Sequence, residues 1–143
     1  IGVVSSPMFK TFLVLNLFIL LLRFAYISVS PFDLSPEEAQ YWDWSRHLDW
    51  SYYSKPPLVA CLNFISTSLL GNSEFAVRLW AALFGFLSSL LAYAVAKRFF
   101  KSERVAFLLG LLPNALPGFN ALSFLFTTDT PLFFFWGLSF YLL

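Results

Sequence analysis

Two long apolar runs constrain this chain more than any other feature. They cover residues 11–29 and 75–96, and each is about as long as the 20 residues that a helix needs to cross a bilayer. Apolar residues make up 59% of the 143 residues and charged residues only 12%, about half the share usual in soluble domains. We therefore predict an all-α, polytopic membrane protein.

Two further segments extend the predicted set of spans. Residues 105–125 are apolar, but Pro113 and Pro117 should kink a helix there. The apolar run over 131–143 is too short to cross a bilayer, so we expect the sequence to be the N-terminal part of a longer protein. The single cysteine, Cys61, cannot support a disulfide framework or a metal cluster.

A polar, aromatic segment over residues 30–74 separates the first two spans. Its first part carries five of the eight acidic residues of the chain. Ser35 and Glu38 have the spacing of a capping box, with Pro36 at the first helical position. We predict an interfacial helix over about 36–48, with its aromatic side chains at the level of the lipid headgroups.

The distribution of lysine and arginine predicts the orientation in the membrane. A basic cluster follows the second span and is opposed by one acid; its members are Lys97, Arg98, Lys101 and Arg104. Such an excess marks the cytoplasmic side. Residues 58–70 are short for a crossing. If they form a second interfacial helix instead, Lys10 shares the cytoplasmic side with the cluster, and residues 31–78 lie wholly outside. We predict this arrangement.

Four charged residues on the outer side are candidates for chemistry. Glu37 and Glu38 stand at a helix start, where acidic residues also simply complement the helix dipole. Asp129, between apolar runs, is costly in lipid unless it faces water or a cation, although it too could serve only as a helix-start residue. Lys55 before two prolines could hold an anionic group, or be an exposed interfacial cation.

Two other polar side chains lie outside this set of four. Arg23 lies inside the first span, where it could extend to the interface or pair with an acidic group of the site. His47 is expected to be a surface residue, because one histidine without a second histidine or a cysteine nearby is a weak basis for zinc.

Three strings of the sequence carry a resemblance to a known family: PEEAQYWDWSRHLDWSYYSKPPL, GNSEFAVRL and TTDTPLFFFW. They resemble the bacterial branch of the C-type, polyprenyl-phosphate-dependent glycosyltransferases. This branch includes the aminoarabinose transferases that modify lipid A and relatives of the protein O-mannosyltransferases. The resemblance runs in order over nearly all of residues 11–143. It implies the transmembrane fold of that family, in a multi-pass protein of the inner membrane with an extracytoplasmic active site.

The resemblance implies a catalytic role for three carboxylates. The family's acidic pair, usually Asp-Glu, matches Glu37 and Glu38, and the aspartate of its second outer loop matches Asp129. Glu37 would take the proton of the acceptor hydroxyl, while Glu38 and Asp129 would orient the acceptor or a cation. Aminoarabinose transferases bind a metal through a glutamate where this chain has Ser54. A divalent cation would therefore depend on Glu38 or Asp129.

The resemblance also implies a binding site for the donor phosphate. The Lys-Pro pair that meets this phosphate in the family matches Lys55-Pro56, and tyrosine and arginine positions match Tyr41 and Arg46. Arg78 is a further candidate, since a phosphate leaving group requires cations to stabilise its charge.

The expected function is the inverting transfer of a sugar from a polyprenyl-phosphate donor to a lipid, glycan or protein acceptor on the periplasmic side. Membrane lipids are expected partners, and the net charge of +1 gives no reason to expect nucleic acid. One alternative is a transporter or flippase for a lipid-linked substrate, although Arg23 is nearly the only charge within the spans. Another is a non-catalytic paralogue in which Glu37 fails to replace the usual aspartate.

Overall fold

The computed structural model describes residues 6–53 and 55–143. Within these residues the chain forms helices joined by loops, and the pairing of Tyr52 with Lys55 is an isolated bridge rather than a strand. The helices are α1 (Pro7–Val29), α2 (Pro36–Ser45), α3 (Leu58–Leu70), α4 (Glu74–Phe100), α5 (Glu103–Ala115), α6 (Pro117–Ala121) and α7 (Asp129–Leu142). The predicted all-α fold is confirmed. In this part of the chain, α1 and α4 are long and apolar enough to cross a membrane, and α3 is a shorter apolar helix.

The helix α2 begins as predicted and ends earlier than predicted. The Ser35 hydroxyl accepts the Glu38 N–H, and the Glu38 carboxylate accepts the Ser35 N–H, so the capping box is confirmed. We expected the helix to continue to residue 48, but it ends at Ser45. The Tyr52 ring stacks on Trp44, and its hydroxyl lies 3.1 Å from the carbonyl oxygens of both Trp44 and His47. The loop folds back over the end of α2, and its Tyr52 hydroxyl supplies a hydrogen-bond donor beside these carbonyl oxygens.

Prolines divide the segment that we expected to form one kinked span over 105–125. Helix α5 ends at Ala115, Leu116 is extended with ψ 122°, and α6 begins at Pro117. A residue before proline is pushed out of the helical region by the proline ring, which explains the break at Leu116. After α6 the chain turns through 122–128 and enters α7.

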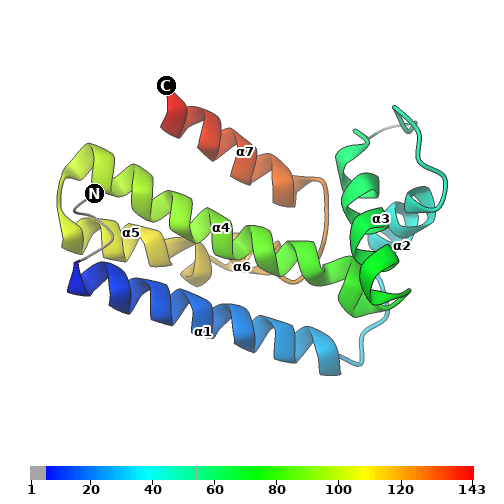
Figure 1. Cartoon of the computed structure of the whole chain (residues 1–143), viewed down its shortest axis with the longest axis horizontal. Coiled ribbons are helices and arrows are strands. Elements are labelled where there is room, and N and C mark those ends of the chain that lie inside the picture. The colour runs from blue at the N-terminus through cyan, green and yellow to red at the C-terminus, as the bar shows by residue number, and fades with distance from the viewer. Residues whose placement is uncertain (1–5, 54) are drawn as a thin grey trace.

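The helices form a bundle with two different ends (Figure 1). Helices α2 and α3 pack together at the end where α1 finishes and both α4 and α7 begin. The opposite end gathers the start of α1, the end of α4 and the start of α5, and with them Lys10 and the predicted basic cluster. The outer loop and the basic residues thus lie at opposite ends, as the predicted orientation requires.

Three apolar clusters fill the bundle along its length. At the basic end, Phe12 stacks on Tyr93 with ring centroids 4.7 Å apart. A Cβ atom at Gly110 would lie 2.8 Å from the Phe12 ring, so α5 approaches α1 and α4 closely only because this residue is glycine. A second cluster around Leu20 and Ala82 fills the middle of the bundle. The third lies beneath α2 and α3 and is described with the site.

Arg23 is buried within the bundle, and both predictions for it are wrong. Its side chain is not extended to the interface, because the residue is only 2% exposed. Its Nη2 donates to the side-chain oxygens of Asn114 and Asn120, each at 2.9 Å, and its guanidinium lies over the Phe124 ring. Among the described residues it forms no ion pair with a carboxylate. Arg23 of α1 thus binds both asparagines, and the Asn114 amide also donates to the Ser89 hydroxyl of α4 at 3.1 Å.

Candidate active site

Glu38 joins three segments at the outer end of the bundle through hydrogen bonds. Its side chain is fully buried and accepts four hydrogen bonds. Arg78 donates to both carboxylate oxygens, from Nε at 3.1 Å and from Nη2 at 3.0 Å. The Ser35 N–H donates at 3.0 Å and the Phe126 N–H at 3.1 Å. Burial by itself raises the pKa of Glu38, but the bonds from Arg78, Ser35 and Phe126 outweigh it and hold the pKa below the ordinary value.

Arg78 also forms hydrogen bonds with the loop that follows α1. Its Nη1 donates to the Phe32 carbonyl at 3.0 Å, and its Nη2 donates to the Asp33 carbonyl at 2.9 Å. One buried guanidinium, in the first turns of α4, thus joins the loop after α1, helix α2 and, through Glu38, the loop before α7. We expected Arg78 to contribute to phosphate binding, and the structure engages it with these protein groups.

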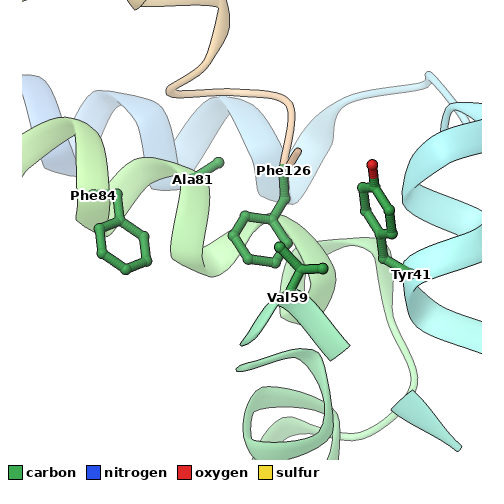
Figure 2. Close-up of a cluster of buried hydrophobic side chains, with 5 residues drawn as sticks. All are labelled: Tyr41, Val59, Ala81, Phe84 and Phe126. Carbon is green, nitrogen blue, oxygen red and sulfur yellow. The ribbon is translucent and has the colours of Figure 1, made fainter. Parts of the chain in front are cut away.

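Phe126 fixes the second loop against the same region. It is fully buried in a cluster with Tyr41, Val59, Ala81 and Phe84, which come from α2, α3 and α4 (Figure 2). This burial and the hydrogen bond of its N–H to Glu38 determine where the loop crosses the end of the bundle. Helix α7 starts three residues later.

Asp129 is presented at the first position of α7. The loop before it is closed by the Thr130 hydroxyl, which lies 3.2 Å from the Leu122 carbonyl and accepts the Thr127 N–H at 3.4 Å. Asp129 itself is exposed, and its carboxylate makes no hydrogen bond to the described residues. The fold therefore holds the backbone of this residue and leaves its charge free.

Lys55 lies in the first outer loop, between α2 and α3. Its backbone pairs with Tyr52, and its side chain is partly exposed. The pKa of Lys55 is raised, most by the Tyr41 hydroxyl and also by the negative charges of Glu37 and Asp129. The Tyr41 contact falls short of a completed hydrogen bond, since this buried hydroxyl has no partner among the described residues. Lys55 thus lies within electrostatic reach of both exposed carboxylates, which are far apart in the sequence.

Glu37 is the exposed member of the acidic pair. It stands in the first turn of α2 beside the buried Glu38, and its side chain is open to solvent. Glu37, Lys55, Asp129 and the Tyr41 hydroxyl together form what we call the outer charged site. It combines one ammonium group with two carboxylates and one hydroxyl that make no hydrogen bond to the described residues.

Arg46 and His47 come directly after α2. Arg46 follows α2, is exposed, and places its guanidinium 5.2 Å from the centre of the Trp42 ring. The structure thus pairs it with an aromatic ring of its own helix. His47 is exposed, as predicted.

The described residues do not fit a metal site by themselves. No three histidine, cysteine, aspartate or glutamate side chains gather in the parts of the chain that the structure covers. The oxygens of Glu38 are occupied by N–H donors, which leaves Asp129 and Glu37 with a lysine beside them. Ser54, the position at which the resemblance implies a metal-binding glutamate in aminoarabinose transferases, lies outside the described residues.

Sequence reasoning assigned Glu38 to the reaction and overlooked its partner. The signal was available in Arg78: an arginine in the first turns of a long apolar helix is costly without a counter-charge. The acid of a capping box on the same side of the membrane was a candidate partner. The role of Phe126 had no comparable signal, because one phenylalanine among many apolar neighbours is not distinctive.

Comparison with known proteins identifies relatives of this chain. Residues 54–143 match the model of a family described as dolichyl-phosphate-mannose-protein mannosyltransferase. The lipid A galacturonosyltransferase RgtD of Rhizobium johnstonii is 37% identical over 114 residues, which are 79% of this chain and 24% of that protein. The undecaprenyl phosphate-alpha-4-amino-4-deoxy-L-arabinose arabinosyl transferase 2 of Proteus mirabilis is 32% identical over 89 residues, which are 54% of this chain and 16% of that protein.

The chain thus spans about a quarter or less of the length of these curated relatives. No solved structure matches it. The family model covers more than half of the chain, and the resemblance predicted from the three sequence strings is confirmed. The chain belongs to the dolichyl-phosphate-mannose-protein mannosyltransferase family of glycosyltransferases.

Proposed function

We propose that the full-length protein transfers a sugar from a polyprenyl-phosphate donor to an acceptor, and that the outer charged site carries out the reaction. One observation supports this proposal most: Glu37 and Asp129, from different loops, both lie within electrostatic reach of Lys55 at one end of the bundle. A base for the acceptor and a cation for the leaving phosphate are the two groups that such a transfer requires.

The proposed step uses Glu37 as the general base. Its free carboxylate takes the proton of an acceptor hydroxyl while the hydroxyl oxygen attacks the anomeric carbon of the donor sugar. The bond from that carbon to the phosphate oxygen breaks, and the polyprenyl phosphate leaves with the electron pair. Attack from the face opposite the phosphate inverts the configuration. Glu38 cannot replace Glu37 without giving up its ion pair with Arg78.

Lys55 and Tyr41 face the leaving phosphate in this proposal. The raised pKa of Lys55 keeps its ammonium group charged at any physiological pH, as charge stabilisation requires. The buried Tyr41 hydroxyl, which has no partner among the described residues, can donate a hydrogen bond to a phosphate oxygen. Asp129 would then orient the acceptor. If a divalent cation takes part, Asp129 holds it together with ligands from outside the described residues.

The side of the membrane and the acceptor are also part of the proposal. Lys10 and the basic cluster lie at the end opposite the outer charged site, which supports an extracytoplasmic site in a multi-pass protein of the inner membrane. A lipid acceptor is favoured over a glycan or a protein, because the relative from Rhizobium johnstonii is named for its action on lipid A.

The test is the release of free polyprenyl phosphate by purified full-length protein supplied with a polyprenyl-phosphate sugar. We expect release only when a lipid A acceptor is present, with the sugar recovered on the acceptor. A transporter, or a paralogue without activity, would release no polyprenyl phosphate under either condition, and that result would refute the proposal.

A further inference from the structure

A large groove opens at the basic end of the bundle, far from the outer charged site. It lies between the start of α1, the end of α4 and the end of α7, and its volume is about 620 Å³. Its apolar wall includes Phe9, Tyr93 and Tyr141, one residue from each of these helices. The groove is therefore a feature of helix packing rather than of one surface loop.

Three cations line the same groove: Lys97, Arg98 and Lys101. They occupy the last turn of α4 and the residue that follows it. The groove thus combines an aromatic wall with a dense positive rim. A ligand that fits both must carry a negative group beside an apolar body.

Glu103 is the acidic residue near the groove, and it does not neutralise all three cations. Glu103 pairs with Lys97 and accepts hydrogen bonds from the hydroxyls of Tyr93 at 2.7 Å and Ser6 at 3.0 Å. Lys97, with help from Tyr93, lowers the pKa of Glu103 to about 2, so this carboxylate remains ionised and neutralises Lys97 alone. Among the residues that the structure describes, no carboxylate pairs with Arg98 or Lys101.

The side chain of Arg98 and the backbone of Lys101 are held in position. Arg98 donates to the Tyr141 carbonyl and lies 5.5 Å from the centre of the Tyr141 ring, which fixes it across the gap between α4 and α7. Lys101 ends α4 in the left-handed conformation with φ 51°, where glycine is usual, and its N–H donates to the Lys97 carbonyl. Lys101 thus brings a charge to the groove from a backbone conformation that costs a residue with a side chain some energy.

We propose that this groove binds an anionic phospholipid of the cytoplasmic leaflet, with its phosphate between Arg98 and Lys101 and its glycerol and upper acyl chain against Phe9 and Tyr141. The cytoplasmic leaflet carries anionic lipids, and basic pockets between transmembrane helices suit their head groups. This site is separate from the proposed transfer reaction, because it lies at the other end of the bundle and shares no residue with the outer charged site.

The test uses the full-length protein purified in detergent with equal amounts of phosphatidylglycerol and phosphatidylethanolamine. Native mass spectrometry counts the lipids that remain bound. We expect the wild-type protein to retain phosphatidylglycerol in preference. The double variant Arg98→Gln/Lys101→Gln should lose this retention roughly 30-fold, since each cation near an anionic lipid contributes about 1 kcal/mol and 1.4 kcal/mol is a factor of ten.

A matched double variant separates the groove from general surface charge. Lys10→Gln/Arg104→Gln removes the same two charges at the same end of the bundle, from exposed residues that do not line the groove. It should retain phosphatidylglycerol as the wild type does. If the Arg98/Lys101 variant fails to fold, Arg98→Gln alone should show a loss of about fivefold.

Three outcomes would overturn this proposal. Equal losses in the two double variants would assign the effect to net charge rather than to the groove. A wild-type protein without preferential retention would show that something else, such as a later helix of the protein, fills the groove. Displacement of the lipid by millimolar inorganic phosphate would show a site for free phosphate instead.

Discussion

Glu37 and Glu38 show how two adjacent identical residues receive opposite environments. Successive positions on a helix point about 100° apart, so a helix that packs one residue inward leaves its neighbour outward. Glu38 points inward, and its carboxylate accepts hydrogen bonds from Arg78 and from two backbone N–H groups. Glu37 keeps free lone pairs for a proton. The acidic pair thus consists of one structural carboxylate and one available carboxylate.

The substitution Glu37→Gln tests the available carboxylate. It preserves the size of the side chain and removes the proton acceptor, so acceptor-dependent turnover of the full-length protein should fall by roughly 100-fold or more. The free energy of unfolding should change by no more than about 0.3–1 kcal/mol, the contribution of an acid in the first turn of a helix. Glu37→Asp serves as the control and should restore most of the activity. Normal turnover in Glu37→Gln would transfer the role to another group.

Glu38→Gln tests the structural carboxylate through pH. The pKa of Glu38 is lower in the folded state than its ordinary value of 4.5, which we take for the unfolded state. At any pH between these two pKa values, the unfolded state therefore binds more protons than the folded state. The contribution of Glu38 to stability is therefore complete above pH 4.5 and is lost as the pH falls through the folded pKa. Glu38→Gln should remove this contribution and, by leaving Arg78 buried without a counter-charge, cost about 3–5 kcal/mol at pH 7. Thermal unfolding of both proteins from pH 7 to pH 3 measures the difference, and parallel curves would show that Glu38 does not titrate in this way.

At the level of helices, the sequence predicted boundaries well where neighbouring residues determine them. The capping box placed the start of α2, and the run over 58–70 has the bounds observed for α3. Signals that depend on packing were less informative. Pro113 and Pro117 predicted a bend, but only the packed structure shows that α5 stops and α6 starts anew. The partners of Arg23 were also hidden, since they come from α5 and α6, far along the chain.

The close approach of α1, α4 and α5 yields a prediction for Gly110. In Gly110→Ala the new Cβ would lie 2.8 Å from the Phe12 ring and 2.9 Å from Tyr93, so the helices must separate. The free energy of unfolding should fall by about 1–3 kcal/mol, the usual cost of overpacking. Gly118→Ala is the matched control, because nothing lies within 4 Å of the added atom. Urea unfolding of both variants measures the difference, and equal stabilities would mean that the contact relaxes freely.

At the level of the whole molecule, the orientation in the membrane decides which residues can meet. Asn72 is exposed at the outer end, and Arg104 is exposed at the basic end. In a full-length protein without other cysteines, Asn72→Cys should react with a membrane-impermeant maleimide from the periplasmic side only. Arg104→Cys, the control, should react from the cytoplasmic side only. Labelling of Asn72→Cys from the cytoplasmic side only would contradict this orientation and is the result expected if α3 crosses the membrane.

Orientation also explains how much of the site could be predicted. Once residues 31–78 were placed outside, the return of Asp129 to the same side followed from the number of crossings. The sequence therefore predicted that Glu37, Lys55 and Asp129 share one end of the bundle, and the structure brings the two carboxylates within electrostatic reach of Lys55. The sequence could not predict that the Phe126 N–H donates to the Glu38 carboxylate, because this hydrogen bond depends on the path of one loop over a packed core.

The central claim is that the outer charged site transfers the sugar, and Asp129→Asn tests it most directly. The Asp129 carboxylate makes no hydrogen bond to the described residues, and asparagine suits a helix start about as well as aspartate, so the fold should survive. The measurement is the acceptor-dependent release of polyprenyl phosphate by the purified full-length variant beside the wild type, with thermal unfolding as the check on folding. We predict an unfolding temperature like that of the wild type and a release rate lower by roughly 100-fold, the scale expected when one electrostatic group of a site is lost. A folded Asp129→Asn protein that releases polyprenyl phosphate at the wild-type rate would contradict the account.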